Sequence, residues 1–297
     1  MIAFTGSKET GFRIIELAAT SSRYAHGVKQ VIAEMGGKNA IIVDADADLD
    51  EAILHILQSA FGYQGQKCSA CSRLIVLEEN YDRLVERLKS ATESIHLGPV
   101  EDPKNFVGAV IEPAALQKVL DYLAIGKEEG TILIQRDITA LPSSASDEPT
   151  GPQGDALCSP LPVQTPFFSP LTIFVDVRPE QRLAQEEIFG PVLVVIKVKD
   201  FDEALEAANS TPYALTGALF SRSPQNIAKA RRAFRVGNLY INRGCTGALV
   251  ERHPFGGFKM SGIGSKAGGP DYLLQFMVPR NIVENTIRRG FAPADQE

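Results

Sequence analysis

The most informative stretch of the sequence is Gly65-Gln66-Lys67-Cys68-Ser69-Ala70-Cys71-Ser72-Arg73. Apolar residues at helical spacing over 49–63 precede it, and a β-branched run over 73–77 follows it. A cysteine at such a helix-to-strand junction, with a lysine beside it, can act as a nucleophile of lowered pKa. Considered alone, Cys68 fits a buried and unreactive thiol equally well.

Helix and strand patterns alternate in the same way along most of the chain. The strand-like runs lie at 40–44, 73–77, 171–177, 192–198, 214–220 and 238–242. The helical patterns lie at 11–20, 49–63, 81–95, 113–125, 202–209 and 224–234. This alternation predicts an α/β fold with a mostly parallel or mixed sheet. One stretch interrupts it: residues 142–170 hold seven prolines among serines and glycines, which predicts a long surface loop or insertion.

Composition excludes several classes of protein. With 297 residues, 44% of them hydrophobic and 22% charged, the chain can bury an ordinary core and does not resemble a disordered protein. Its apolar runs are far shorter than the roughly 20 residues of a membrane-spanning helix. A net charge of -6 indicates no nucleic-acid partner. Four cysteines are too few for a disulfide scaffold, and no secretory signal is readable, so the sequence predicts a cytoplasmic protein.

Four further motifs could carry chemistry. Phe4-Thr5-Gly6-Ser7 ends a predicted strand before a helix, an arrangement that favours an anion, although no Walker A ending follows. Glu34-Met35-Gly36-Gly37-Lys38-Asn39 lies between two apolar runs, and its glycines allow close backbone approach to a ligand. Glu187-Ile188-Phe189-Gly190-Pro191 opens a strand, and residues 254–262 form a loop rich in glycine and aromatic residues. The glycines of residues 262–269 predict a further loop. Each motif alone also fits a plain turn, a surface acid or a strand entry.

Other patterns resemble known binding motifs but lack residues or a context that those motifs require. Residues 44–48 begin like a calcium loop but lack the required glycine and glutamate, and residues 262–267 imitate a dinucleotide fingerprint without a preceding strand. The four histidines are scattered, so we predict no metal site. Cys68 and Cys71 could still form a redox pair.

Taken together, the order and spacing of the five motifs resemble the aldehyde dehydrogenase superfamily, from about Ile2 to about Phe276. Within it, the stretch at 65–73 and the segments at 242–248 and 264–273 are similar to the 1-pyrroline-5-carboxylate dehydrogenases, also called glutamate-γ-semialdehyde dehydrogenases. The resemblance implies an aldehyde dehydrogenase-like catalytic domain and a remnant of a Rossmann-like NAD-binding domain.

The resemblance also implies a reaction and its residues. Cys68 would be the nucleophile and Glu34, 34 residues earlier, the general base. The enzyme would oxidise L-glutamate γ-semialdehyde to L-glutamate with NAD, through a cysteine thiohemiacetal and a thioester. The family's oxyanion hole uses the backbone N–H of the nucleophile and an asparagine from an earlier segment.

Further positions match the family's binding residues. The positions implied for NAD are Gly6, Ser7, Glu187 and Phe189. The positions implied for the substrate are Ser69, Gly268, Gly269 and Phe276.

The resemblance divides the chain into three parts. Residues 1–36 would be the remnant of the cofactor domain, 37–264 the catalytic domain with an insertion at 142–170, and 265–297 a substrate-anchor loop and tail. Family members carry a long N-terminal part before these motifs, so we expect a truncated chain that is inactive alone. The full-length form is expected to be a homo-oligomer or part of a bifunctional proline-utilisation protein.

Three alternatives remain open from the residues alone. The chain could be a non-catalytic aldehyde dehydrogenase fragment or a dehydrogenase for another aldehyde. It could also be a thiol–disulfide protein that uses Cys68 and Cys71.

Overall fold

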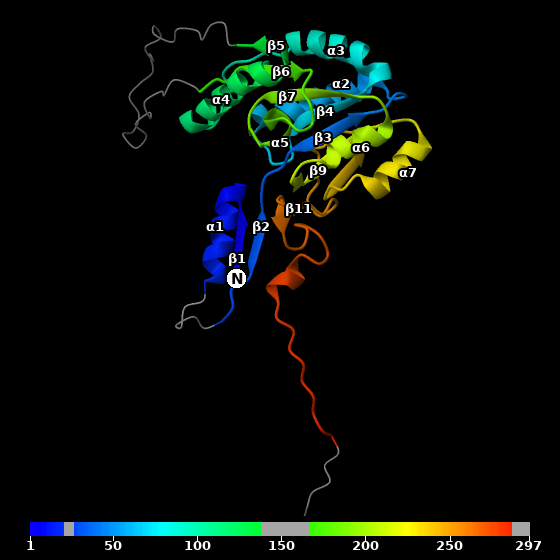
Figure 1. Cartoon of the computed structure of the whole chain (residues 1–297). Helices are drawn as coiled ribbons and strands as arrows, with labels where there is room; N and C mark the ends of the chain where they lie inside the picture. Colours follow the sequence, from blue (N-terminus) through cyan, green and yellow to red (C-terminus); the bar gives the residue numbers. More distant parts are fainter. Residues whose placement is uncertain (21–26, 138–166, 287–297) are drawn as a thin grey trace, which may run out of the picture.

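The computed structural model describes residues 1–20, 27–137 and 167–286 and is built around a seven-stranded sheet (Figure 1). Neighbouring strands run parallel, except for the antiparallel pair at the β5 edge. In sheet order, the strands are β10 (Asn238–Ile241), β9 (Thr216–Phe220), β3 (Asn39–Val43), β4 (Cys71–Leu77), β7 (Val192–Val198), β6 (Leu171–Val175) and β5 (Thr131–Arg136). The predicted α/β fold with a mostly parallel or mixed sheet is confirmed.

Helices cover both faces of this sheet (Figure 1). They are α2 (Leu49–Phe61), α3 (Glu78–Glu93), α4 (Pro113–Glu129), α5 (Arg182–Gln185), α6 (Phe201–Asn209) and α7 (Pro224–Ala233). Side chains of β3 alternate between two apolar clusters: Ile41 packs with α2 and α3, whereas Ile42 packs with α4, α6 and α7. Because both faces are covered, the central strands are apolar throughout, as expected for a buried parallel sheet.

Helix α2 and the turn that follows it position the candidate nucleophile. Asp48 caps the helix by accepting from the amides of Asp50 and Glu51, so the helix begins where the sequence predicted. After Phe61 the short helix η1 (Gly62–Gly65) contains three consecutive residues with positive φ, at 60°, 58° and 68°. A side chain on Gly65 would collide with the carbonyl of Gly190, so this position requires glycine.

A smaller sheet lies beside the large one and contains β1 (Ile2–Thr5), β2 (Val31–Glu34) and β12 (Gly262–Ile263). Strand β1 is parallel to β2, and the helix α1 (Lys8–Ala19) packs on this pair. The sequence predicted a loop over 262–269, but Gly262–Ile263 pairs antiparallel with β2. That prediction was wrong because two-residue strands depend on a partner rather than on a local pattern.

Other differences lie at the edges of the fold. Strand β5 and helix α5 were not predicted, because one is half-exposed and the other spans only four residues. A two-stranded ribbon joins β8 (Tyr213–Ala214) to β11 (Phe258–Lys259). Of the predicted insertion, residues 142–166 lie outside the described residues, as does Cys158. Within 1–20, 27–137 and 167–286, no helix combines the length and hydrophobicity that crossing a bilayer requires.

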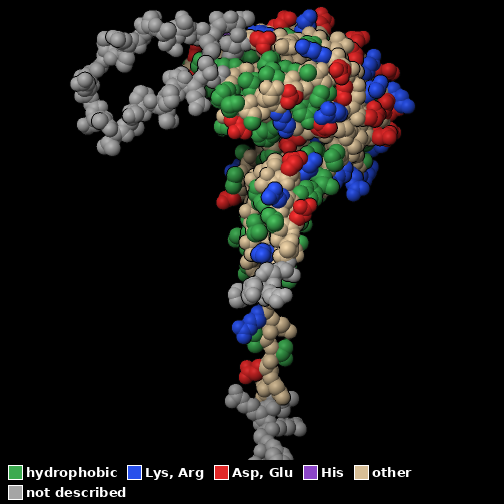
Figure 2. Space-filling view, turned by 60° about the vertical axis from the view of Figure 1, so that its left-hand side comes forward, with side chains coloured by type: hydrophobic (Ala, Val, Ile, Leu, Met, Phe, Trp, Pro, Cys, Tyr) green, Lys and Arg blue, Asp and Glu red, His purple; other side chains and the backbone are tan. Residues whose placement is uncertain are grey.

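The chain after the short helix η2 (Leu273–Phe276) extends away from the body of the protein (Figure 1). Figure 2 shows acidic and basic side chains spread over the larger body of the protein. The narrow extension lies below that body in the same view. Several apolar side chains of the extension are exposed, namely Met277, Val278, Ile282 and Val283.

Candidate active site

Cys68 lies between η1 and β4 and is half-buried. The main chain around it is held by Asn39, the first residue of β3. The Asn39 amide nitrogen donates to the carbonyl of Cys68 at 2.8 Å and to that of Ala70 at 2.9 Å. Its side-chain oxygen accepts from the Thr216 amide at 3.0 Å. One buried side chain therefore joins the cysteine loop to two strands of the large sheet.

Two carboxylates act on the Cys68 thiol. Burial raises the pKa of Cys68, and the charges of Glu187 and Glu34 raise it further. The backbone amides of Ser69 and Cys68 itself oppose this rise in the pKa. The structure thus brings together three predicted site residues that are far apart in the sequence, and burial and the two charges favour the neutral form of the thiol.

Glu34 ends β2, and its carbonyl accepts from the Gly6 amide at 3.1 Å. Its carboxylate is partly buried, and Oε2 has no hydrogen-bond partner among the described residues. Burial raises the pKa of Glu34 to about 7, and the charge of Lys266 opposes that rise. A carboxyl group with a pKa near neutrality is suited to take up and release a proton in that range.

Glu187 lies two residues after α5 and faces the glycines that follow Glu34. Its Oε1 accepts from the Gly37 amide at 3.1 Å, and a side chain on Gly36 would collide with its carboxylate. Burial raises the pKa of Glu187, and the Gly37 amide opposes the rise. Phe189 has a positive φ of 61°, and its ring is exposed. It lines the same hollow as Glu187 and Gly37.

Gly6 and Ser7 connect β1 to α1, as the sequence predicted. Ser7 caps α1, because its hydroxyl accepts from the Thr10 amide at 3.2 Å. Both residues are exposed, and the Gly6 amide bonds to the Glu34 carbonyl. The exposed helix start therefore lies beside the strand end that carries Glu34.

The predicted substrate residues are more widely spread. Ser69 is buried, and its carbonyl accepts from Thr216 Oγ1 at 3.3 Å. Gly268 has a φ of 68°, and the Gly269 amide donates to the carbonyl of Lys266 at 3.1 Å. Phe276 lies in η2, where its exposed ring packs edge-on to Tyr272. Only Ser69 lies directly beside the cysteine.

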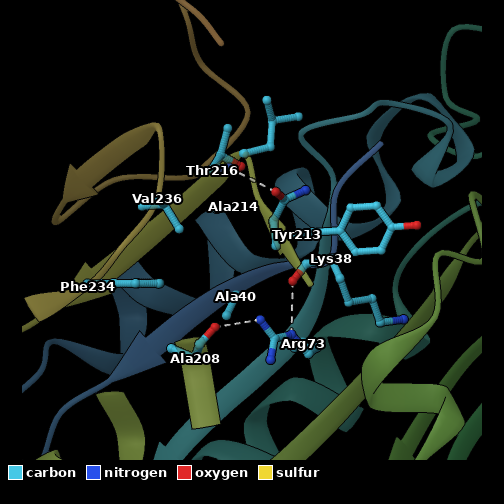
Figure 3. Close-up of a pocket in the computed structure, with 11 residues that line it drawn as sticks. Lys38, Ala40, Arg73, Ala208, Tyr213, Ala214, Thr216, Phe234 and Val236 are labelled. Carbon is cyan, nitrogen blue, oxygen red and sulfur yellow. Dashed lines mark hydrogen bonds between the residues drawn. The ribbon is translucent and has the colours of Figure 1, made fainter. Parts of the chain in front are cut away.

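Three residues around the site were not predicted from the sequence: Asn39, Arg73 and Lys266. Arg73 is buried under the site and donates to the carbonyls of Lys38, Ala207 and Ala208 at 2.8–2.9 Å. Figure 3 shows the Lys38 side chain directed away from this guanidinium, alongside Tyr213. Burial lowers the pKa of Lys38 to about 7, and its Nζ has no partner among the described residues. A polar residue inside an otherwise apolar strand is the signal that could have identified Asn39 and Arg73.

The remaining described cysteines lie in the core. Cys71 and Cys245 are both buried, and burial raises the pKa of Cys71 well above its ordinary value. Cys71 Sγ donates to the carbonyl of Arg73 at 3.4 Å, and the thiol of Cys245 lies beside it. The core position of Cys71 gives no support to a redox pair with Cys68. In the described part of the chain, no three His, Cys, Asp or Glu side chains are grouped so that they could hold a metal ion.

Comparison with known sequences establishes the class of protein. The sequence model of the aldehyde dehydrogenase family matches residues 1–150 and 154–282, so the chain belongs to this family. Within the family it is homologous to 1-pyrroline-5-carboxylate dehydrogenases, which confirms the resemblance seen in its motifs.

Two curated relatives illustrate this homology. The 1-pyrroline-5-carboxylate dehydrogenase of Anoxybacillus flavithermus is 48% identical over 283 residues, covering 95% of this chain and 50% of the relative. That of Bacillus subtilis is 47% identical with the same coverage. The chain therefore spans about half the length of the curated relatives it matches.

Comparison with solved structures supports the same family membership. A Thermus 1-pyrroline-5-carboxylate dehydrogenase with bound NAD is 44% identical and superposes with a TM-score of 0.81, covering 92% of this chain and 48% of that one. Proline utilization A from Bdellovibrio bacteriovorus is 51% identical with a TM-score of 0.85, covering 99% of this chain and 28% of that one.

Proposed function

We propose that this chain carries the catalytic machinery of an NAD-dependent dehydrogenase that oxidises L-glutamate γ-semialdehyde to L-glutamate. The observation that carries the proposal is that Glu187 accepts from the Gly37 amide, which packs against the Cys68 carbonyl, beside the strand end that carries Glu34. The homology to 1-pyrroline-5-carboxylate dehydrogenases supports this substrate over other aldehydes. Within this proposal, residues 1–36 belong to the cofactor domain, 37–264 to the catalytic domain, and 265–297 to the substrate anchor and tail.

Cys68 is proposed as the nucleophile. Its thiolate attacks the aldehyde carbon and forms a carbon–sulfur bond, giving a thiohemiacetal whose oxygen faces the backbone N–H of Cys68. Because burial and two carboxylates raise the pKa of this thiol, forming the thiolate requires a proton acceptor nearby. Loss of hydride from the former aldehyde carbon then leaves a thioester on Cys68.

Glu34 is proposed as the general base of the second half-reaction. With its pKa raised to about 7, the Glu34 carboxylate can take a proton from a water molecule that attacks the thioester carbon. The carbon–sulfur bond breaks, L-glutamate leaves, and the sulfur recovers a proton. Glu34 Oε2 is buried and has no hydrogen-bond partner among the described residues, so its lone pairs are free to accept a proton.

The site residues fit the nicotinamide half of NAD. Bound NAD supplies the hydride acceptor of the reaction. Glu187 is held against Gly36 and Gly37 and is suited to bind ribose hydroxyls, while the exposed ring of Phe189 lies in the same hollow. Gly6 and Ser7, at the exposed start of α1, are suited to the pyrophosphate, because the positive end of the helix dipole attracts anions there.

The substrate's charged end is proposed to bind near Ser69 and the loop at Gly268 and Gly269. The positive φ of Gly268 turns backbone amides in a way that suits a carboxylate. Phe276 is proposed to complete this pocket. We also propose that the full-length form is a cytoplasmic homo-oligomer or part of a bifunctional proline-utilisation protein. The similarity to proline utilization A supports the second of these arrangements.

The test is reconstitution. The chain is co-expressed with the N-terminal half of the Bacillus subtilis relative, and NADH formation is followed with glutamate γ-semialdehyde and with simple aliphatic aldehydes. We expect NADH formation that prefers the semialdehyde, disappears in Cys68→Ala and survives in Cys71→Ala. A reconstituted complex that binds NAD but forms no NADH would favour a non-catalytic fragment, and preference for aliphatic aldehydes would overturn the substrate.

A further inference from the structure

Lys266 occupies a fixed position behind the carboxylate of Glu34. Its ammonium group donates to the carbonyls of Gly256 at 2.5 Å and Gly237 at 2.6 Å, and to Asn238 Oδ1 at 3.3 Å. An ammonium group has three N–H donors, so these three acceptors use all of them. Lys266 therefore has no donor left with which to bond Glu34.

The backbone around Lys266 is held on both sides. Ala267 exchanges two hydrogen bonds with Phe255, at 2.7 and 2.8 Å. The Asn238 side chain donates to the carbonyl of Pro254 at 2.8 Å, which joins the start of β10 to the same loop. The lysine is thus fixed by main-chain pairing as well as by its own three bonds.

Gly256 separates Lys266 from Glu34. A Cβ atom at Gly256 would lie 2.7 Å from Glu34 Oε1 and 3.5 Å from the Cα of Lys266. Gly256 also has a φ of 156°, a conformation that side chains rarely adopt. Only glycine fits between the two residues, and its carbonyl is the one that Lys266 holds most closely.

The two charges nevertheless act on each other. Lys266 lowers the pKa of Glu34, and Glu34 in turn raises the pKa of Lys266 against the effect of burial. The charge of Glu34 also raises the pKa of the Cys68 thiol. A direct ion pair would occupy the carboxylate, whereas here Glu34 Oε2 keeps no partner within the described part of the chain.

We propose that Lys266 is a positioning residue for Glu34: it holds Gly256 between itself and the carboxylate, and it keeps a positive charge beside that carboxylate without bonding to either of its oxygens. This role rests on the proposed function, in which Glu34 activates the hydrolytic water. It explains how the effect of burial on this carboxyl is partly offset while the carboxylate stays free of a direct bond to Lys266.

The test measures the ionisation of Glu34 directly in the chain as it exists. The protein is labelled with ¹³C at the glutamate carboxyl carbon, and the Glu34 signal is identified by its loss in Glu34→Gln. Lys266→Met removes both the bonds and the charge, whereas Lys266→Gln removes the charge but keeps two N–H donors, on a shorter side chain. Lys266→Arg keeps the charge. Lys259→Met is the matched control, since Lys259 likewise donates to two carbonyls, at 3.1 Å each, and Glu34 does not act on its pKa.

We expect the titration midpoint of Glu34 to rise by about one pH unit in Lys266→Met and Lys266→Gln, because a nearby opposite charge favours the ionised carboxyl. It should stay near its original value in Lys266→Arg and Lys259→Met. An unchanged midpoint in Lys266→Gln, or an equal rise in Lys259→Met, would overturn the proposal. The titration needs neither substrate nor NAD. Failure of the dehydrogenase assay with the expected titration would therefore refute only the proposed function, and an active enzyme with an unshifted midpoint would refute only the role of Lys266.

Discussion

The side-chain amide of Asn39 donates to the main-chain carbonyl of Cys68 at 2.8 Å, from a position 29 residues earlier in the chain. The same amide reaches Ala70, and its oxygen accepts from Thr216. The cysteine loop therefore owes its position to a buried side chain on β3 rather than to its own sequence. This relationship leads to the first of four predictions.

Asn39→Ala should destabilise the protein by at least about 2 kcal/mol, because it leaves several buried backbone groups without a partner. Chemical denaturation measures the loss. Asn105→Ala is the matched control, since Asn105 donates a single bond, to the Pro99 carbonyl in a part-buried turn. An equal loss in both variants would show that Asn39 does not hold the loop.

Gly37→Ala should cost about 1–3 kcal/mol, the usual cost of inserting a methyl group into a packed site. Its Cβ would lie 2.6 Å from the Cys68 carbonyl and 2.8 Å from Asn39 Oδ1. Gly27→Ala should leave the free energy of unfolding nearly unchanged, because nothing lies within 4 Å of that position. Thermal and urea unfolding of the two variants give the comparison, and equal stabilities would contradict the close packing at Gly37.

Glu187→Gln should speed the alkylation of Cys68 by iodoacetamide at mildly alkaline pH. Removing a carboxylate that raises the pKa of the thiol lowers that pKa, and each pKa unit changes the thiolate fraction up to tenfold. We expect an increase of about threefold or more, measured at Cys68 by peptide mass mapping.

The neighbouring variant Glu186→Gln is the control for this alkylation experiment. Glu186 pairs with Arg182 and Tyr122 and is not among the main influences on the pKa of Cys68. Its alkylation rate should match that of the unmodified chain. A slower reaction in Glu187→Gln would mean that the carboxylate activates the thiol instead of suppressing it.

The stability of the protein should fall with rising pH through the titration of Glu34. Burial raises the pKa of this group from 4.5 to about 7, so between these values the folded chain holds a proton that the unfolded chain has released. The stabilisation is fully present below pH 4.5 and is lost as the pH rises through about 7.

Urea unfolding of the unmodified chain and of Glu34→Gln, at pH values below 4.5 and above 7, isolates this effect. Glu34→Gln should lose less stability across the interval, because a glutamine releases no proton. Glu86→Gln, at an exposed position on α3, should behave like the unmodified chain. The prediction fails if Glu34→Gln follows the pH profile of the unmodified chain.

Most of the fold could be predicted from local patterns. Helix α2 begins at Leu49 as expected, because Asp48 is a capping residue ahead of an amphipathic run, and β7 matches its predicted span 192–198. Strand β12 could not be predicted, because its two residues become a strand only by pairing with β2. The half-exposed β5 likewise has no strong alternation to reveal it.

The sequence by itself determined the family and the identity of the candidate chemical groups, because the order of motifs around Glu34, Cys68 and Glu187 is a property of the chain alone. Only the tertiary structure decided what surrounds those groups. Burial sets the pKa of Glu34 near neutrality, Asn39 holds the cysteine loop, and Lys266 lies behind Gly256 without bonding the carboxylate. These effects depend on desolvation and on hydrogen bonds between residues far apart in the chain, and no local sequence pattern encodes either.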